Sequence, residues 1–226
     1  MKNSIKDLFK DQSNYTLAIT HRSSLNENSA ISQSNERLEF LGDAILEFVI
    51  SKHLYNKYPN KEEGFLTAMR ANLVNTINLA KVANELELGK HLLLSKGEEE
   101  SGGRENQSLL ANTVEALIGA LYIDSGLDAA EKFIVKNIYK NLQEIENLPL
   151  KDAKSRLQEY VQSEGVQAPV YKVTKEIGPD HNKTFFVDVL INNKFVANGK
   201  GKNKSIAQQD AAEKALELIK ENKYEF

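Results

Sequence analysis

The 226-residue chain contains no cysteine, no tryptophan and only four prolines. The absence of cysteine excludes disulfides, thiolate metal sites and a cysteine nucleophile, and it fits a reducing compartment. The sequence has no run of 18 consecutive apolar residues, and its first residues, MKNSIKDLFKDQS, include no apolar segment. We therefore expect neither a membrane span nor a signal peptide, and we expect a cytoplasmic protein.

Charge is distributed unevenly along the chain. The net charge is −3 in total, but residues 151–226 hold 13 Lys and Arg against 11 Asp and Glu, a net charge of +2. Residues 1–150 therefore carry −5. This asymmetry favours a metal-binding front part joined to an anion-binding tail.

The stretch NERLEFLGDAIL at residues 35–46 carries a row of carboxylates. Glu36, Glu39, Asp43 and Glu47 follow one another at steps of three, four and four residues, which places them on one face of a helix. No Lys or Arg interleaves this face. It is either a solvated acidic face or a site for a hard divalent cation such as magnesium, manganese or calcium. The residues expected to face the core are Leu38, Leu41, Ile45, Phe48 and Val49.

Residues 15–147 have a helical pattern with short breaks and no alternating run that would predict a sheet. We expect helices over residues 15–23, 35–57 and 66–88, the last of them stopped by Gly89. Gly42 is costly inside a helix and indicates a ligand or a close packing contact. The core residues expected in the third helix are Leu66, Met69, Leu73, Ile77, Leu79, Val82 and Leu86.

A polar stretch at residues 95–106 is either a mobile surface loop or a substrate-contacting loop, with Lys96 and Arg104 available for phosphates. An apolar helix follows, with Ser108 as its expected N-cap. Within it, Glu115 has no charged neighbour on the helix. Its carboxylate either reaches the surface or binds the same cation as the acidic face, and Gly119 would let another helix approach closely.

Residues 151–226 predict an α-β-β-β-α unit. We expect a helix over residues 151–163, strands over 169–175, 184–191 and 194–198, and a closing helix over 204–221. Asn192 and Asn193 form a good hairpin turn between the second and third strands. Three lysines, Lys200, Lys202 and Lys204, precede the last helix. They indicate either a solvated cluster or a phosphate-binding device at a helix N-terminus.

Together these segments resemble the ribonuclease III family. NERLEFLGDAIL resembles the family's signature stretch, ANTVEALIGALYIDSG at residues 111–126 resembles its second motif, and the tail resembles a double-stranded-RNA-binding domain. The resemblance implies an all-α nuclease domain at residues 1–147, a linker at 148–151, and a small α+β domain at 152–222. It also implies a homodimer that cleaves structured precursors, ribosomal RNA among them, leaving 5′-phosphates, 3′-hydroxyls and short 3′ overhangs.

The resemblance assigns roles to individual residues of the nuclease part. Asp43 and Glu115 would be catalytic, Glu36 would be a further acidic residue near the cleft, and Phe40 would insert into the partner subunit. The family normally has Asp where this chain has Asn112. The implied ligands of Mg²⁺, or of Mn²⁺ in its place, are Glu39, Asp43, Asn112 and Glu115.

In the tail, the resemblance implies contacts to double-stranded RNA through the minor groove and the phosphates. Ser205 replaces a second lysine that the family usually has, so we expect weaker phosphate affinity. The implied RNA-binding residues are Ser155, Gln158, Glu159, Gln162, His181, Lys202, Asn203 and Lys204.

Asn112 leaves two hypotheses open. Because the other ligands and the RNA-binding unit remain, we expect a metal-dependent endonuclease; the alternative is a protein that binds duplex RNA without cutting it. A helical scaffold with an acidic face would leave Glu115 and the lysines unexplained. We interpret His21, His53 and His91 as packing or surface residues.

Overall fold

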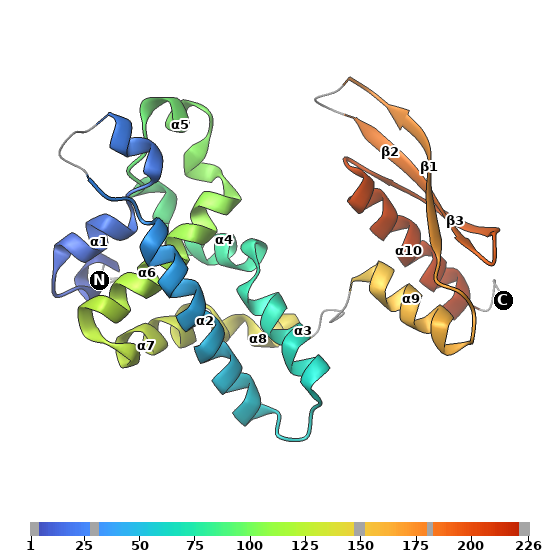
Figure 1. The fold of residues 1–226 in the computed structure, drawn as a ribbon, viewed down its shortest axis with the longest axis horizontal. Coiled ribbons are helices and arrows are strands. Elements are labelled where there is room, and N and C mark those ends of the chain that lie inside the picture. Colours follow the sequence, from blue (N-terminus) through green and yellow to red (C-terminus); the bar gives the residue numbers. More distant parts are fainter. Residues whose placement is uncertain (1–4, 28–31, 147–151, 180–182, 222–226) are drawn as a thin grey trace. The chain divides into compact units, whose positions relative to one another are not determined.

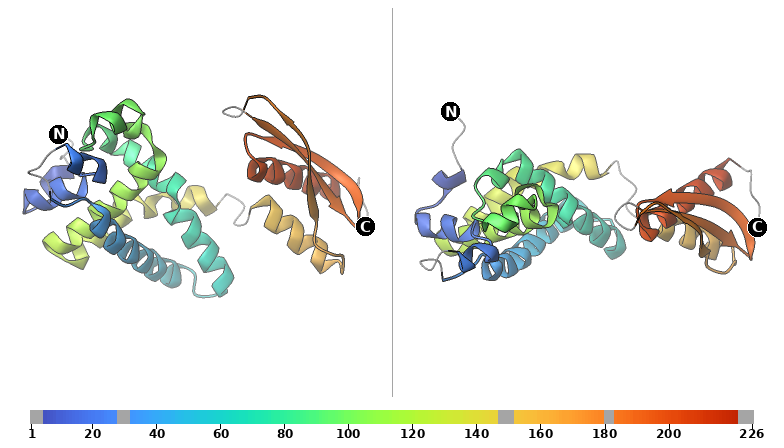
Figure 2. Two further views of the ribbon diagram at one scale, coloured as in Figure 1. Left: turned by 45° about the horizontal axis from the view of Figure 1, so that its top comes forward. Right: turned by 90° about the horizontal axis from the view of Figure 1, so that it is seen from above.

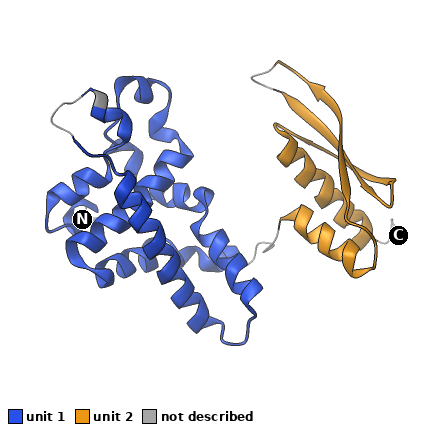
Figure 3. Cartoon of the chain, viewed as in Figure 1, with its two compact units in different colours: residues 1–150 blue, residues 151–226 orange. Residues whose placement is uncertain are grey.

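The computed structural model describes residues 5–27, 32–146, 152–179 and 183–221. The chain divides into two compact units, residues 1–150 and residues 151–226 (Figure 3). Each has its own hydrophobic core. The expected linker, residues 148–151, lies outside the described residues. No helix in the described part of the chain is both long and apolar enough to cross a membrane.

Helices build the first unit, as predicted, and α6 runs through its core (Figures 1 and 2). Ten of the 19 residues of α6 are buried, so this helix is enclosed by its neighbours on most sides. The α-helices are α1 (Gln12–Ala18), α2 (Glu36–Lys57), α3 (Glu63–Val74), α4 (Thr76–Glu85), α5 (Lys96–Glu100), α6 (Gln107–Ser125), α7 (Leu127–Asn137) and α8 (Leu142–Glu146). The 3₁₀ helices are η1 (Ile5–Leu8), η2 (Arg22–Asn26), η3 (Leu88–Lys90), η4 (Gly103–Glu105) and η5 (Tyr139–Asn141).

The helix predicted over residues 66–88 is wrong, because two helices occupy this stretch. Asn75 separates α3 from α4, and its side-chain oxygen accepts a hydrogen bond from the Asn78 backbone N–H at 2.9 Å. A short polar side chain that caps a helix in this way ends the preceding one. Ile77, expected in the core, is 71% exposed in the first turn of α4.

Other helix ends also differ from the prediction. The helix expected over residues 15–23 ends at Ala18 and is followed by η2. Gly89 lies in η3 and does not stop α4, which ends at Glu85. Asn106, not Ser108, is the N-cap of α6. Phe48, expected in the core, is 56% exposed.

The second unit has the predicted α-β-β-β-α order. Its sheet is antiparallel in the order β1-β2-β3, and α9 and α10 pack on one face of it (Figure 1). Asn192 and Asn193 both have positive φ, at 51° and 61°, as the predicted hairpin turn requires. The elements are α9 (Ala153–Ser163), β1 (Val170–Ile177), β2 (Thr184–Ile191), β3 (Lys194–Gly201) and α10 (Lys204–Lys220).

Candidate active site

Two glycines allow α2 and α6 to cross at close range. A Cβ atom at Gly42 would lie 1.8 Å from the Glu115 carbonyl oxygen, and one at Gly119 would lie 2.2 Å from the Leu38 carbonyl oxygen. Any side chain at either position would therefore push the two backbones apart. The close helix contact that the sequence predicted for these glycines is confirmed.

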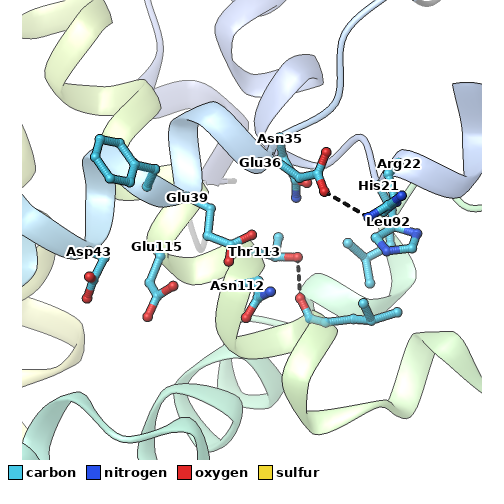
Figure 4. A pocket seen from close by; sticks show the side chains of 12 residues that line it. His21, Arg22, Asn35, Glu36, Glu39, Asp43, Leu92, Asn112, Thr113 and Glu115 are labelled. Atoms are coloured by element: carbon cyan, nitrogen blue, oxygen red, sulfur yellow. Dashed lines mark hydrogen bonds and ion pairs between the residues drawn. The ribbon is translucent and has the colours of Figure 1, made fainter.

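A pocket of about 500 Å³ lies beside this crossing (Figure 4). Glu39 and Asp43 reach it from α2, and Asn112 and Glu115 reach it from α6. The structure thus brings together the four side chains that the sequence grouped as metal ligands. The other residues that line the pocket are His21, Arg22, Asn35, Glu36, Phe40, Leu92, Leu109 and Thr113.

Negative charge accumulates at the centre of the pocket. Burial, followed by the nearby charges of Asp43 and Glu39, raises the pKa of Glu115 to about 7. Burial and the charges of Glu36 and Asp43 also raise the pKa of Glu39, against a hydrogen bond from Asn112 that lowers it. A site that disfavours its own ionised carboxylates in this way favours a cation.

The row of four carboxylates on α2 divides into a paired and an unpaired set. Glu36 forms an ion pair with Arg22 at 3.3 Å and accepts a hydrogen bond from the Ser34 hydroxyl at 2.9 Å. Glu47 lies 3.7 Å from the guanidinium of Arg70. Within the described part of the chain, no basic side chain forms an ion pair with the carboxylates between them, Glu39 and Asp43. The carboxylates without a basic partner are therefore the two at the helix crossing.

The side chains at the crossing suit a hard divalent cation by their chemistry, because carboxylate and amide oxygens are the donors that Mg²⁺ and Mn²⁺ prefer. Among the described residues, no three His, Cys, Asp or Glu side chains converge closely enough to hold an ion as they stand. Three like charges repel one another unless a cation lies between them. By its chemistry, the donor set in the pocket fits a hard divalent cation.

The prediction that Arg104 is available for phosphates is wrong. Its guanidinium donates hydrogen bonds to the Glu99 carboxylate at 2.6 Å and to the carbonyl oxygens of Gly89 and Leu92 at 2.8 and 3.1 Å. Most of the stretch predicted as a loop is α5 and η4, and Gly103 in η4 is buried. Arg104 therefore fixes this segment to the preceding one.

Sequence reasoning gave no role in the site to six of the residues that line the pocket, and His21 and Arg22 are two of them. Both lie at the start of η2, at the end of the pocket opposite Asp43 (Figure 4). From the sequence, His21 is interpreted as a packing or surface residue, because a metal site built from carboxylates needs no histidine as a base. Nothing in the local sequence places this segment against α2 and α6.

On the second unit, α9 presents one exposed polar face. Gln158, Glu159 and Gln162 are exposed, while Leu157 and Val161 on the opposite face are buried in the core. The spacing of three and four residues produces this division. The remaining predicted residue of the face, Ser155, is half-buried, and its hydroxyl donates to the Asp152 carboxylate at 2.9 Å.

The three predicted residues at the start of α10 are all exposed. Asn203 is the N-cap, and its side-chain oxygen accepts a hydrogen bond from the Ile206 N–H at 2.8 Å. Lys202 precedes it, and Lys204 lies 3.8 Å from the Glu176 carboxylate. This cap holds two lysines at a helix N-terminus, where anions bind. His181 lies outside the described residues.

Comparison with known proteins identifies both units. Residues 11–142 match the family model described as Ribonuclease-III-like, and residues 153–219 match the double-stranded RNA binding motif. Ribonuclease 3 of Natranaerobius thermophilus is 46% identical over 202 residues, which cover 89% of this chain and 88% of that protein. Ribonuclease 3 of Borreliella afzelii is 44% identical over 222 residues, 96% of this chain and 90% of that protein.

A solved structure also matches. The nuclease domain of ribonuclease III from Campylobacter jejuni, described as flexible in a region involved in dimer formation, aligns with a TM-score of 0.56 at 40% identity. It covers 61% of this chain and 95% of that one. The match to the nuclease model spans every residue that lines the pocket. The chain belongs to the ribonuclease III family, the metal-dependent endoribonucleases specific for double-stranded RNA.

Proposed function

We propose that this chain hydrolyses phosphodiester bonds of duplex RNA in the pocket between α2 and α6, with Mg²⁺ held by Glu39, Asp43, Asn112 and Glu115. Mn²⁺ would substitute for Mg²⁺. One observation carries this proposal: four oxygen-bearing side chains from two helices line one pocket in a member of the ribonuclease III family. The products would have 5′-phosphate and 3′-hydroxyl ends, with short 3′ overhangs.

When bound, the cation would polarise the scissile phosphate and lower the pKa of a water molecule. Asp43 and Glu115 are the proposed catalytic residues, because they would hold the cation next to the scissile phosphate. The raised pKa of Glu115 means that, near neutral pH, part of the metal-free protein holds a proton there. That proton must leave before the carboxylate can act as a ligand, so metal binding and pH are coupled. Glu36, held by Arg22, would act as a secondary acidic residue at the edge of the pocket.

Asn112 keeps a carbonyl oxygen for coordination but has one negative charge fewer than Asp. Its hydrogen bond to Glu39 lowers the pKa of that carboxyl, which partly offsets the repulsion in the pocket. An Asp at this position would add a fourth like charge and bind a cation more tightly. We therefore propose that Asn112 weakens metal affinity and does not abolish cleavage. A protein that binds duplex RNA without cutting it is the less favoured alternative.

The second unit would hold the duplex. We propose domain bounds of 1–147 and 152–222, joined by a linker at 148–151. The helix face of α9 would read the minor groove, and the start of α10 would bind phosphates, as expected for such a module. The proposed contacts are Ser155, Gln158, Glu159, Gln162, His181, Lys202, Asn203 and Lys204.

We also propose that the chain acts as a homodimer in the cytoplasm on ribosomal and other structured RNA precursors. Phe40 supports the dimer, because an 82% exposed aromatic side chain on a core helix is costly unless a partner covers it. It lies directly after Glu39 and lines the same pocket. A partner that covers Phe40 would therefore approach the site of cleavage.

Cleavage of a long RNA duplex across a magnesium titration tests the proposed function. The wild type should cut and leave 3′ overhangs, and Asp43→Asn should reduce the rate at least about 100-fold. Asp128→Asn, an exposed aspartate on α7 outside the pocket, is the matched control and should cut like the wild type. Asn112→Asp should reach half-maximal rate at a lower magnesium concentration.

Two outcomes would change the conclusion. If only Asn112→Asp cuts, the pocket is the metal site but the natural chain is a duplex-binding protein. If Asp43→Asn cuts as fast as the control, the proposed ligand set is wrong, even though duplex RNA still binds.

A further inference from the structure

We propose that His21 is a further RNA-binding residue of the pocket, which donates a hydrogen bond from Nε2 to a phosphate oxygen of the RNA strand. This inference rests on the proposed function, because it requires the RNA backbone to enter the pocket. His21 belongs to neither acidic helix and is not one of the metal ligands proposed above.

A chain of hydrogen bonds fixes which ring nitrogen of His21 carries the proton. The Ser95 backbone N–H donates to the Ser23 hydroxyl oxygen at 3.0 Å, and that hydroxyl lies 2.9 Å from Nδ1 of His21. The Ser23 backbone N–H also donates to Nδ1, at 3.3 Å. A backbone N–H can only donate, so Nδ1 must accept. The proton of the neutral ring therefore resides on Nε2.

The same contacts hold the ring in place. The His21 backbone N–H donates to the Leu93 carbonyl oxygen at 3.0 Å, and the side chain caps the first turn of η2. The ring is half-buried and lines the pocket. Among the described residues, Nε2 has no hydrogen-bond partner. The structure thus presents a pre-oriented N–H donor to the pocket, and holding it there costs little further entropy.

Charge in the pocket indicates what this donor binds. The carboxylates at the Asp43 end repel RNA phosphates unless a cation lies between them. At the opposite end, His21 adjoins Arg22, whose side chain is 70% exposed and held by Glu36 (Figure 4). An RNA strand presents a phosphate at every nucleotide. A phosphate next to the scissile one therefore meets the Nε2–H donor of His21 and the guanidinium of Arg22 at this end of the pocket.

Two substitutions separate the donor role of His21 from its capping role. In His21→Asn the side-chain oxygen takes the place of Nδ1 and keeps the cap, but nothing replaces Nε2. In His21→Gln the amide N–H reaches the position of Nε2, but the δ acceptor is lost. His91→Asn is the control, because His91 is exposed and does not line the pocket. For each full-length variant, kcat/KM on a duplex RNA at fixed magnesium and the Tm are measured.

We expect the two measurements to rank the variants in opposite order. His21→Asn should keep the wild-type Tm and lose about tenfold in kcat/KM, the usual effect of one hydrogen bond to a charged group. His21→Gln should have a lower Tm but keep kcat/KM to within about threefold of the wild type. The control should change neither quantity.

The inference is overturned if kcat/KM follows the Tm, if both His21 variants cleave like the wild type, or if both lose activity equally. The wild type in the same assay keeps this failure distinct from failure of the proposed function. If the wild type cuts and His21→Asn cuts equally well, the proposed role of His21 is overturned but the proposed metal site is not.

Discussion

Glu115 is the residue in which the conflict between folding and function is most direct. Its carboxyl is half-buried on a helix whose other residues are mostly apolar, and it faces two more carboxylates. Burial, with the charges of Asp43 and Glu39, raises its pKa to about 7. Without a cation, ionising this group costs the folded state free energy, because the unfolded chain ionises it near its ordinary value of 4.5.

The sign of this cost predicts how stability depends on pH in the absence of metal. Between pH 4.5 and 7 the folded protein binds the Glu115 proton more tightly than the unfolded chain, so the free energy of unfolding falls as pH rises through this range. The side chain in Glu115→Gln stays neutral, so the free energy of unfolding of this variant should not fall in this way as pH rises. We expect the variant to equal the wild type at pH 4 and to exceed it by about 2 kcal/mol at pH 8, after allowance for solvent screening.

Urea unfolding with a chelator present, at both pH values, measures this difference. Glu105→Gln, an exposed glutamate outside the pocket, is the control and should change little at either pH. Adding Mg²⁺ should stabilise the wild type and not Glu115→Gln. If Glu115→Gln gains no stability at pH 8, the carboxyl is better solvated than its position indicates.

At the scale of elements, the crossing of α2 and α6 determines whether the pocket exists. Gly119→Ala would place a Cβ atom 2.2 Å from the Leu38 carbonyl oxygen, which is backbone and cannot turn away. We expect a loss of about 3 kcal/mol or more in the free energy of unfolding, as for overpacked cores. Cleavage should fall with it, because displacing α2 separates Glu39 and Asp43 from α6.

Gly64→Ala is the matched control for this substitution. Gly64 lies in α3, and a Cβ atom there would meet nothing within 4 Å. Alanine should therefore stabilise the protein by about 0.5–1 kcal/mol. A Gly119→Ala variant that is as stable and active as the wild type would show that the helices separate without cost.

The elements also show which features the sequence could predict. The carboxylate row and Gly42 were visible because a helical period and an uncompensated penalty are local properties. The break at Asn75 was not, since a short polar side chain can either continue a helix or cap the next one. The backbone partners of Arg104 and the place of His21 in the pocket could not be predicted, because each depends on other segments of the chain. The local sequence pattern therefore predicted the acidic residues of the pocket and did not predict the hydrogen-bond donors His21 and Arg22.

At the scale of the whole molecule, the proposed function assigns the holding of the anionic duplex to the second unit, since the first unit is acidic. Lys202 and Lys204 are exposed at the start of α10, where backbone N–H groups also face outward. Each lysine that contacts a phosphate releases a counterion when RNA binds. Lys202→Gln and Lys204→Gln should each weaken duplex binding and reduce the slope of log K against log salt by about 1.

Binding of the full-length chain to a duplex, measured at several salt concentrations in a chelator, gives these slopes without cleavage. Lys220→Gln, at the other end of α10, is the control and should leave the slope unchanged. Equal slopes for all three variants would show that the lysines at the start of α10 do not contact phosphates.

Symmetry sets how strongly a substitution at Phe40 would weaken the proposed dimer. In a two-fold dimer each substitution acts twice, because the same side chain from both subunits is lost. Covering a Phe side chain contributes roughly 1.5–3 kcal/mol, so Phe40→Ala should weaken a dimer by about 3–6 kcal/mol. That corresponds to a dimer Kd raised by a factor of about 10²–10⁴.

Sedimentation of the wild type should give a dimer, and sedimentation of Phe40→Ala should give a largely monomeric protein at the same concentration. Ile123→Ala, which removes a 59% exposed side chain from α6, should remain dimeric. A wild type that sediments as a monomer would contradict the proposed homodimer, and the exposure of Phe40 would then need another explanation.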